Sequence, residues 1–134
     1  TTDIEKALSW CIQEGFQSVS IIGATGLRED HSISNIFVIA SYISEFKEMS
    51  ILTNYGRFIP ISHYREFDSF VGQQVSIFSL DSKAKLKTTN LKYNLKNVPL
   101  PNLFSGISNE ALHSFFSIDS HGSPAIIFQT HGVK

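Results

Sequence analysis

Four side chains that could do chemistry lie close together in the first third of the chain. Arg28, Asp30, His31 and Asn35 come directly after a glycine-containing turn. An arginine guanidinium can hold phosphate oxygens through two parallel hydrogen bonds. A carboxylate beside it can accept or orient a hydroxyl proton. These residue types therefore favour a site for a phosphate-bearing ligand.

A strand and a helix are needed to position these residues, and the sequence predicts both. Residues 18–22 are short and β-branched, as in a buried parallel strand, and Gly23 ends the run. After Asp30, apolar residues recur with helical spacing, which predicts a helix over about residues 31–48. In α/β proteins ligands bind where a strand is followed by a glycine turn and a helix. The backbone N–H groups in the first turn of that helix favour an anion. The glycines fit neither GxGxxG nor GxxxxGK[ST]. The turn could therefore also be only a connection between the strand and the helix, without a ligand site.

Another helix precedes this strand, and many short strands follow residue 48. Thr2 and Glu5 form a capping-box pattern at the start of the first helix, and Gly15 suits its end. Asn54-Tyr55-Gly56 predicts a hairpin, and alternating lysines predict one charged strand face over 83–87. Strands are predicted at residues 50–53, 57–62, 67–70, 75–80, 84–89, 91–95, 115–117 and 125–129. Short strands without long helices indicate a β-sandwich or barrel, so the predicted fold class is α/β followed by all-β.

Composition narrows the class of protein. The chain has 134 residues, which allows one domain or two small ones, and a net charge of −1 gives no electrostatic case for nucleic acid or a membrane surface. No apolar run reaches the roughly 20 residues of a membrane span. Cys11 is the single cysteine, which excludes an internal disulfide and fits a reducing compartment, so we expect a cytoplasmic protein. We expect Cys11 itself to be a small buried residue on a helix.

Several motifs in order resemble those of the thiamine pyrophosphokinase family. The series runs Asp-Ile-Glu-Lys-Ala-Leu at 3–8, then Ile-Ile-Gly-Ala-Thr-Gly-Leu-Arg-Glu-Asp-His at 21–31, then Asn-Ile at 35–36. It is similar to the family's T-D-x-x-K-A helix, its G-A-x-G-x-R-x-D-H loop and its helix with an N-I pair. Further similar stretches are 75–80, 88–95 and 106–110, so the resemblance covers nearly the whole chain. Asn90 stands where the family commonly has glycine, and asparagine also tolerates positive φ.

The resemblance implies a fold and a reaction. Residues 1–48 would be part of an α/β nucleotide-binding-type domain, packed on a β-sandwich at 49–134 that contributes a thiamine pocket. The activity implied is transfer of pyrophosphate from ATP to the hydroxyl of thiamine, with Mg²⁺, giving thiamine pyrophosphate and AMP. It also implies a homodimer whose active sites are shared between subunits. Because the family's upstream segment with further aspartates is absent, the chain resembles the C-terminal part of the enzyme.

The resemblance also implies roles for particular residues. The catalytic residues would be Asp30, Arg28 and Asp3, of which Asp3 would also bind the metal. Contacts to the nucleotide would come from Lys6, Gly26, Arg28, His31 and Asn35, with His31 neutral because it opens a helix. Contacts to thiamine would come from Asp30, Tyr93, Ser108 and Asn109, with the Tyr93 ring under the heterocycle.

Plainer interpretations stay open for most of these residues. Arg28 and Asp30 could form a surface ion pair in which Asp30 caps the second helix. Asp3 could be favoured only by its place in a first helical turn, Asn35 could face only the sheet, and Tyr93 could be one more sandwich aromatic. The chain could also act only as a thiamine-binding or dimerisation module without catalysis, or bind another heterocycle.

Overall fold

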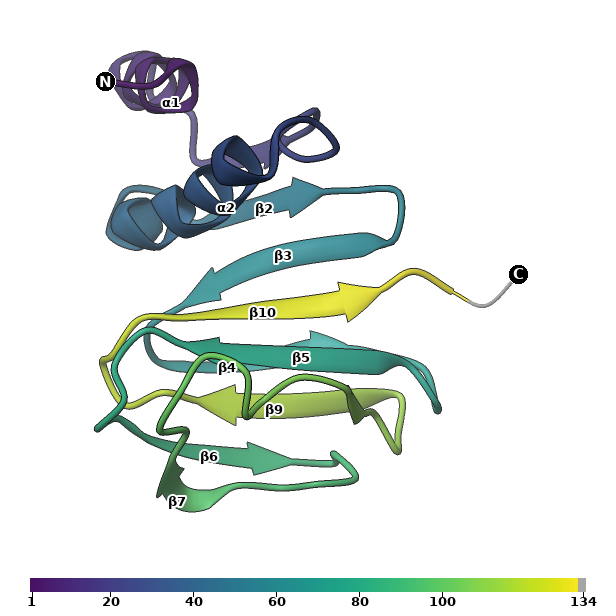
Figure 1. Cartoon of the computed structure of the whole chain (residues 1–134). Coiled ribbons are helices and arrows are strands. Elements are labelled where there is room, and N and C mark those ends of the chain that lie inside the picture. The colour runs from purple at the N-terminus through teal and green to yellow at the C-terminus, as the bar shows by residue number, and fades with distance from the viewer. Residues whose placement is uncertain (133–134) are drawn as a thin grey trace.

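The computed structural model describes residues 1–132, in which helices cover one end of a large sheet and a second sheet covers the other end (Figure 1). The helices are α1 (Asp3–Gln13), α2 (Glu29–Val38) and the 3-10 helix η1 (Ile39–Glu45). The strands are β1 (Ser18–Ile21), β2 (Glu48–Leu52), β3 (Gly56–Ile61), β4 (Tyr64–Asp68), β5 (Gln74–Ser79), β6 (Lys85–Thr89), β7 (Lys96–Pro99), β8 (Asn109–Glu110), β9 (Phe115–Asp119) and β10 (Ala125–Thr130).

The larger sheet joins the α/β part to the all-β part without a break. Its strand order is β1-β2-β3-β10-β5-β8, and the smaller sheet has the order β4-β9-β6-β7. β1 and β2 run parallel, as strands joined by a helix do, whereas β3, β10, β5 and β8 pair antiparallel. The predicted fold class, α/β followed by all-β, is confirmed.

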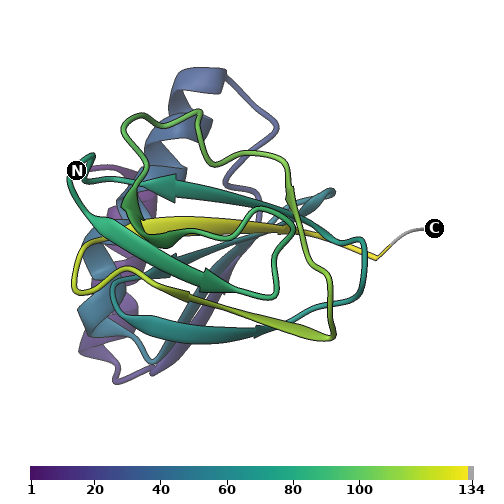
Figure 2. The same cartoon turned by 90° about the horizontal axis from the view of Figure 1, so that it is seen from below.

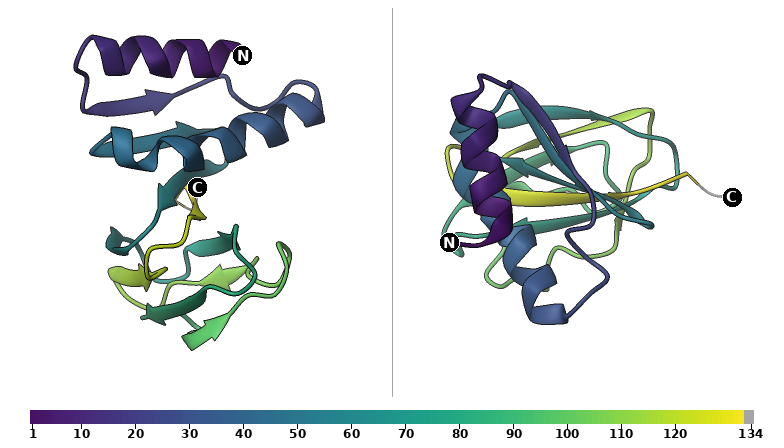
Figure 3. Two further views of the ribbon diagram at one scale, coloured as in Figure 1. Left: turned by 90° about the vertical axis from the view of Figure 1, so that its left-hand side faces the viewer. Right: turned by 90° about the horizontal axis from the view of Figure 1, so that it is seen from above.

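Two hydrophobic cores lie on opposite faces of the larger sheet. The sandwich core forms between the two sheets, from residues such as Ile77, Leu86 and Phe116 (Figure 2). The helical core forms where α1, α2 and η1 cover β1 and β2, and it contains Leu8 and Ile51 (Figure 3). Since side chains alternate between faces along a strand, the central strands can supply both cores.

Most local predictions agree with the structure. The capping box forms, because the Glu5 backbone N–H donates to Thr2 Oγ1 and the Thr2 N–H donates to Glu5 Oε2. The hairpin at 54–56 joins β2 to β3 with Ile51 opposite Phe58. Along β6 the lysines are exposed and the residues between them are buried.

Three local predictions were wrong in detail. The second helix is α-helical only to Val38, and after the 3-10 turn the backbone extends so that β2 can begin at Glu48. Residues 91–95 form a turn with one bridge instead of a strand, because Asn94 Oδ1 accepts hydrogen bonds from Thr88 Oγ1 and the Leu91 N–H. Cys11 is half-buried instead of buried.

No helix within residues 1–132 is both long enough and apolar enough to cross a membrane.

Candidate active site

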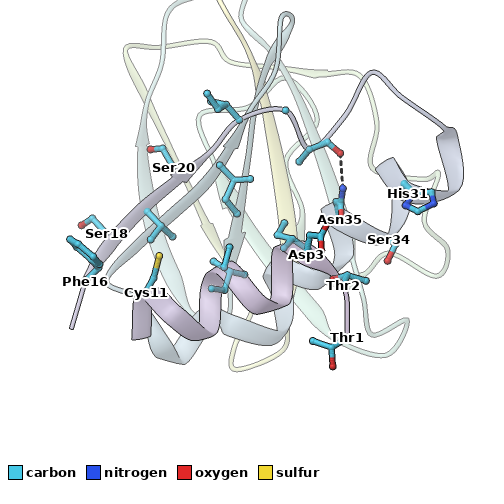
Figure 4. A pocket seen from close by; sticks show the side chains of 18 residues that line it. Thr1, Thr2, Asp3, Cys11, Phe16, Ser18, Ser20, His31, Ser34 and Asn35 are labelled. Atoms are coloured by element: carbon cyan, nitrogen blue, oxygen red, sulfur yellow. Dashed lines mark hydrogen bonds between the residues drawn. The ribbon is translucent and has the colours of Figure 1, made fainter. Parts of the chain in front are cut away.

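The loop between β1 and α2 has a backbone shape that depends on its glycines. Gly23 and Gly26 have φ angles of 73° and 87°, a region that favours glycine. The Asn35 side chain on α2 fixes the loop, since its Nδ2 donates to the Ala24 carbonyl oxygen at 2.9 Å (Figure 4). Ala24 itself is buried. Asn35 therefore has a positioning role that the sequence alone left open.

At the end of this loop Arg28 and Asp30 form a bidentate ion pair. Arg28 Nε donates to Asp30 Oδ1 at 3.0 Å, and Arg28 Nη2 donates to Oδ2 at 2.6 Å. The two side chains are 76% and 63% exposed, so they are accessible to a ligand. The hydrogen bond from Arg28 holds the pKa of the Asp30 carboxyl below its usual range, and the same bond raises the pKa of the guanidinium.

The ion pair of the plainer interpretation is thus present, but the proposed cap is not. The N-cap of α2 is Arg28, which makes no side-chain capping bond. Asp30 lies inside the first turn, where its Oδ1 accepts from the His31 backbone N–H at 3.0 Å. Three N–H groups therefore donate to the Asp30 carboxylate, although Asp30 is not the N-cap. The helix dipole also favours a carboxylate in the first turn.

Two clefts lie on either side of this loop. The first, of about 890 Å³, is bounded by α1, β1 and α2, and its lining includes Asp3, His31 and Asn35 (Figure 4). The second, of about 850 Å³, separates the loop from the β2–β3 hairpin, and its lining includes Gly26 and Tyr55. Five residues predicted to act on the nucleotide or metal thus border the loop or its clefts, namely Asp3, Gly26, Arg28, His31 and Asn35. Lys6 is exposed on α1 and does not line either cleft.

The second cleft contains a leucine and three aromatic residues that the sequence alone did not connect with the site. Leu27 and Tyr55 are 77% and 80% exposed. Phe58 and Phe128 also line the cleft, with ring centroids 4.6 Å apart. The signal available in the sequence was an aromatic residue in a polar hairpin turn, but only strand pairing across the sheet shows that this turn approaches the loop.

Of the four residues predicted to bind thiamine, Tyr93, Ser108 and Asn109 lie in the sandwich part of the chain, whereas Asp30 lies on α2. Asn109 holds the backbone of Tyr93, since its Oδ1 accepts from the Tyr93 N–H at 3.0 Å and its Nδ2 donates to the Tyr93 carbonyl at 2.8 Å. Asn109 Oδ1 also accepts from the Glu110 N–H. Asn109 is therefore buried and largely committed to positioning Tyr93, whose side chain is 63% exposed.

The exposed Tyr93 lies beside the side chain of Lys92. Lys92 Nζ lies 5.5 Å from the ring centroid, a cation–π distance that the sequence analysis did not foresee. Ser108 has φ = 60°, and its backbone N–H donates to Ser76 Oγ at 3.1 Å. Asn90 likewise has φ = 62°, in agreement with the conformation expected where the family has glycine.

The two groups of predicted site residues lie at opposite edges of the larger sheet. The loop with Arg28 and Asp30 follows β1, the first strand in the sheet order, whereas Asn109 belongs to β8, the last. Six strands leave five spacings of about 4.8 Å, or roughly 24 Å across the sheet. One copy of the chain therefore does not bring Tyr93 to Asp30.

The donors near the loop suit a partial metal site. Within residues 1–132 no three His, Cys, Asp or Glu side chains gather as a metal cage. Asp3 contributes one carboxylate at the rim of the first cleft. Mg²⁺ is commonly held by one or two carboxylates together with substrate phosphates and water, so Asp3 fits as one ligand of an ion that arrives with a nucleotide.

Comparison with known proteins assigns both halves of the chain. Residues 1–52 match the family model described as thiamin pyrophosphokinase, catalytic domain, and residues 56–128 match the one described as thiamin pyrophosphokinase, substrate-binding domain. A search of curated proteins gave no match.

Solved structures with the same fold include two bacterial thiamine pyrophosphokinases. The one from Bacillus subtilis is 22% identical, with a TM-score of 0.84 over 99% of this chain and 64% of its own. The one from Geobacillus thermodenitrificans is 21% identical, with a TM-score of 0.83 over 100% of this chain and 63% of its own. The yeast enzyme is 18% identical, with a TM-score of 0.63 over 83% of this chain and 39% of its own.

The chain therefore spans just under two thirds of the length of the two bacterial structures. The substrate-binding model alone matches more than half of the chain, and the catalytic model matches nearly all that precedes it. The chain belongs to the thiamin pyrophosphokinase family.

Proposed function

We propose that the chain takes part in the transfer of pyrophosphate from ATP to the hydroxyl of thiamine, which yields thiamine pyrophosphate and AMP. The observation that carries this proposal is the exposed Arg28–Asp30 pair on the glycine loop after β1. Family membership supplies the reaction class, and the pair supplies a cation and a carboxylate within one hydrogen bond of each other. Transfer between charged oxygens depends mainly on positioning and charge neutralisation, for which this arrangement is suited.

In this proposal Arg28 and Asp30 have complementary roles. Asp30 occupies two of the five guanidinium N–H groups, which leaves three to bind phosphate oxygens. The Asp30 carboxylate is ionised, and Arg28 lowers its pKa further, so Asp30 keeps the negative charge with which it can orient the thiamine hydroxyl. The backbone N–H groups in the first turn of α2 also favour the negative charge of the phosphates.

A divalent ion would bind in the first cleft, which Asp3 lines. Asp3, at the first turn of α1, is the proposed carboxylate ligand for Mg²⁺. When bound, Mg²⁺ neutralises phosphate charge and favours attack on phosphorus. His31 and Asn35 line the same cleft, and we assign them to orientation of the phosphates and of the loop. Lys6 and Gly26 are kept as further nucleotide contacts.

The thiamine site would be completed by a second copy of the chain. We propose a homodimer in which the sandwich of one copy, through Tyr93, Ser108 and Asn109, faces the loop of the other. The breadth of the larger sheet supports this arrangement, because roughly 24 Å separates the two groups within one copy. A twofold axis would form two equivalent sites.

We also propose that the chain divides into two domains, residues 1–48 and residues 49–134, and that the protein is located in the cytoplasm.

A second candidate function is thiamine binding or dimerisation without catalysis. It is favoured by the lining of the first cleft, in which Asp3 is the one carboxylate among the described residues. Calorimetric titration with thiamine beside an assay of AMP release separates the two. AMP release that requires thiamine supports the enzyme, whereas binding without AMP release supports the module.

Asp30→Asn should lower the rate of AMP release by about 10²-fold or more, because the amide neither carries charge nor accepts a proton. Asp68→Asn is the matched control, since it makes the same change at an exposed position on β4. The rates are measured at saturating ATP and thiamine, in a preparation whose unsubstituted protein releases AMP. Equal rates for the two variants would remove Asp30 from the mechanism.

Tyr93→Leu should weaken thiamine binding by about 0.5–2 kcal/mol through loss of the ring face, and leave ATP binding unchanged. Tyr64→Leu is the control, because Tyr64 is a similarly exposed sandwich tyrosine on β4. Calorimetry gives both dissociation constants. A thiamine affinity equal to that of the unsubstituted chain would exclude the ring from the pocket.

Arg28→Gln should raise the pKa of the Asp30 carboxyl toward the usual value of about 3.9, because the main cause of its depression is removed. Because the pKa of Asp30 is lower in the folded chain, the ionised carboxyl stabilises the folded state at higher pH, and this stabilisation is lost as the pH falls through the lowered pKa. A carboxyl ¹³C NMR titration measures the pKa of Asp30, with Arg65→Gln as the control. An unchanged pKa for Asp30 would mean that the ion pair does not form in solution.

A further inference from the structure

The β1–β2 part of the larger sheet has one polar face, and no helix of residues 1–132 covers it. Val19 and Met49 point into the helical core with α1 and α2. The alternate residues Ser18, Ser20 and Ser50 therefore point to the opposite face. The smaller sheet packs over β3, β10 and β5, and among the described residues the sandwich core includes none from β1 or β2.

Two arginines reach this face from neighbouring strands. Arg57 on β3 is paired in register with Leu52 of β2, so it shares the face of the serines. Arg65 comes from β4, an edge strand of the smaller sheet. The pocket that results has a volume of about 220 Å³, and its polar lining is Ser18, Ser20, Glu48, Ser50, Arg57 and Arg65.

Arg57 is held in place by a neutral group. Its Nε and Nη2 both donate to Gln129 Oε1, at 3.2 and 3.0 Å. Gln129 is buried, and its Nε2 donates to the Asp68 carbonyl and to Gln73 Oε1, so the amide oxygen must face Arg57. Within residues 1–132 no carboxylate lies in salt-bridge range of Arg57. A half-buried cation without a counter-charge favours an anion beside it.

Arg65 is also fixed before any ligand binds. Its Nη2 donates to Glu48 Oε2 at 2.9 Å, and its guanidinium carbon lies 5.3 Å from the centroid of the Phe67 ring. The side chain is 28% exposed, whereas that of Glu48 is 60% exposed. Two guanidinium groups and one carboxylate leave the pocket with a charge of +1, and no side-chain hydrogen bond of Ser20 or Ser50 is formed within the described chain.

We propose that this pocket binds a small oxyanion such as a phosphate group. Arginine matches the geometry of such groups, and the two serine hydroxyls are free to donate to further oxygens. A volume of 220 Å³ holds about seven waters at roughly 30 Å³ each, which is room for a tetrahedral anion. Figure 4 shows the side chains of Ser18 and Ser20 pointing away from α1, toward the face of the sheet opposite the helical core. Both residues also border the first cleft, because β1 is an edge strand of the larger sheet.

Inorganic phosphate is the probe for this site. The chain is titrated with phosphate at constant ionic strength while ¹⁵N NMR follows the Arg57 and Arg65 Nε–H signals, and acetate is titrated in parallel to separate phosphate from carboxylate chemistry. Saturable shifts of both arginines are expected. Arg57→Gln should weaken binding at least about tenfold, since a charge-assisted hydrogen bond is lost.

Glu48→Gln provides the test that does not depend on removing a buried group. It raises the charge of the pocket from +1 to +2 and frees Arg65, so phosphate should bind several-fold more tightly. Glu66→Gln is the control, because Glu66 makes the same charge change on β4 but points to the opposite face from Arg65. Equal affinities for the Glu48 and Glu66 variants, or no saturable shift in the unsubstituted chain, would overturn the proposal.

Discussion

The rest of the structure depends on the alternation of side chains along β10. Ile126 and Ile127 are adjacent and fully buried, yet Ile126 belongs to the helical core and Ile127 to the sandwich core. β10 pairs with β3 on one side and β5 on the other, so it has no free edge. One strand thereby fixes the helices and the smaller sheet on opposite faces of a single sheet. The α/β part and the sandwich are consequently held together by strand pairing as well as by side-chain packing.

This shared sheet determines where chemistry can occur. The glycine loop lies beyond the carboxyl end of β1, at one edge, and Asn109 with its bonds to Tyr93 lies at the other. The two edges are roughly 24 Å apart within one copy, and for this reason the site proposed above uses two copies. The proposed composite site is a consequence of strand order, whereas the Arg28–Asp30 pair is local and joins the N-cap of α2 to its first turn.

The sequence predicts features whose causes are local. The capping box, the hairpin at 54–56 and the exposed lysines of β6 each depend on residues a few positions apart, and all are present. The fold class and the family followed from ordered motifs. Residues 91–95 were mispredicted because a side chain, Asn94, supplies the hydrogen bonds that a strand would have taken from a neighbour.

Features that depend on distant pairing could not be predicted. Arg57 and Gln129 are 72 positions apart and meet only because β3 pairs with β10. The family resemblance implied that Asn109 contacts thiamine, and the structure adds that its amide binds the Tyr93 backbone. This second role depends on how β8 approaches the turn at Tyr93, which the sequence does not show. The same holds for the cleft beside Tyr55. Residue type indicates what a side chain can bind, and the sheet order decides what it meets.

The most direct measurement of the composite site is a distance between two copies of the chain. In a Cys11→Ser background, one sample carries a spin label at Leu27→Cys on the loop and another at Lys92→Cys beside Tyr93. The two samples are mixed in the presence of thiamine, ATP and Mg²⁺. Double electron–electron resonance then gives the distance between the label on the loop of one copy and the label beside Tyr93 of another. A chain labelled at both positions, diluted in unlabelled chain, gives the distance within one copy. Shared sites predict a distance between copies shorter than the distance within one copy. Absence of dipolar coupling between copies would contradict the shared site.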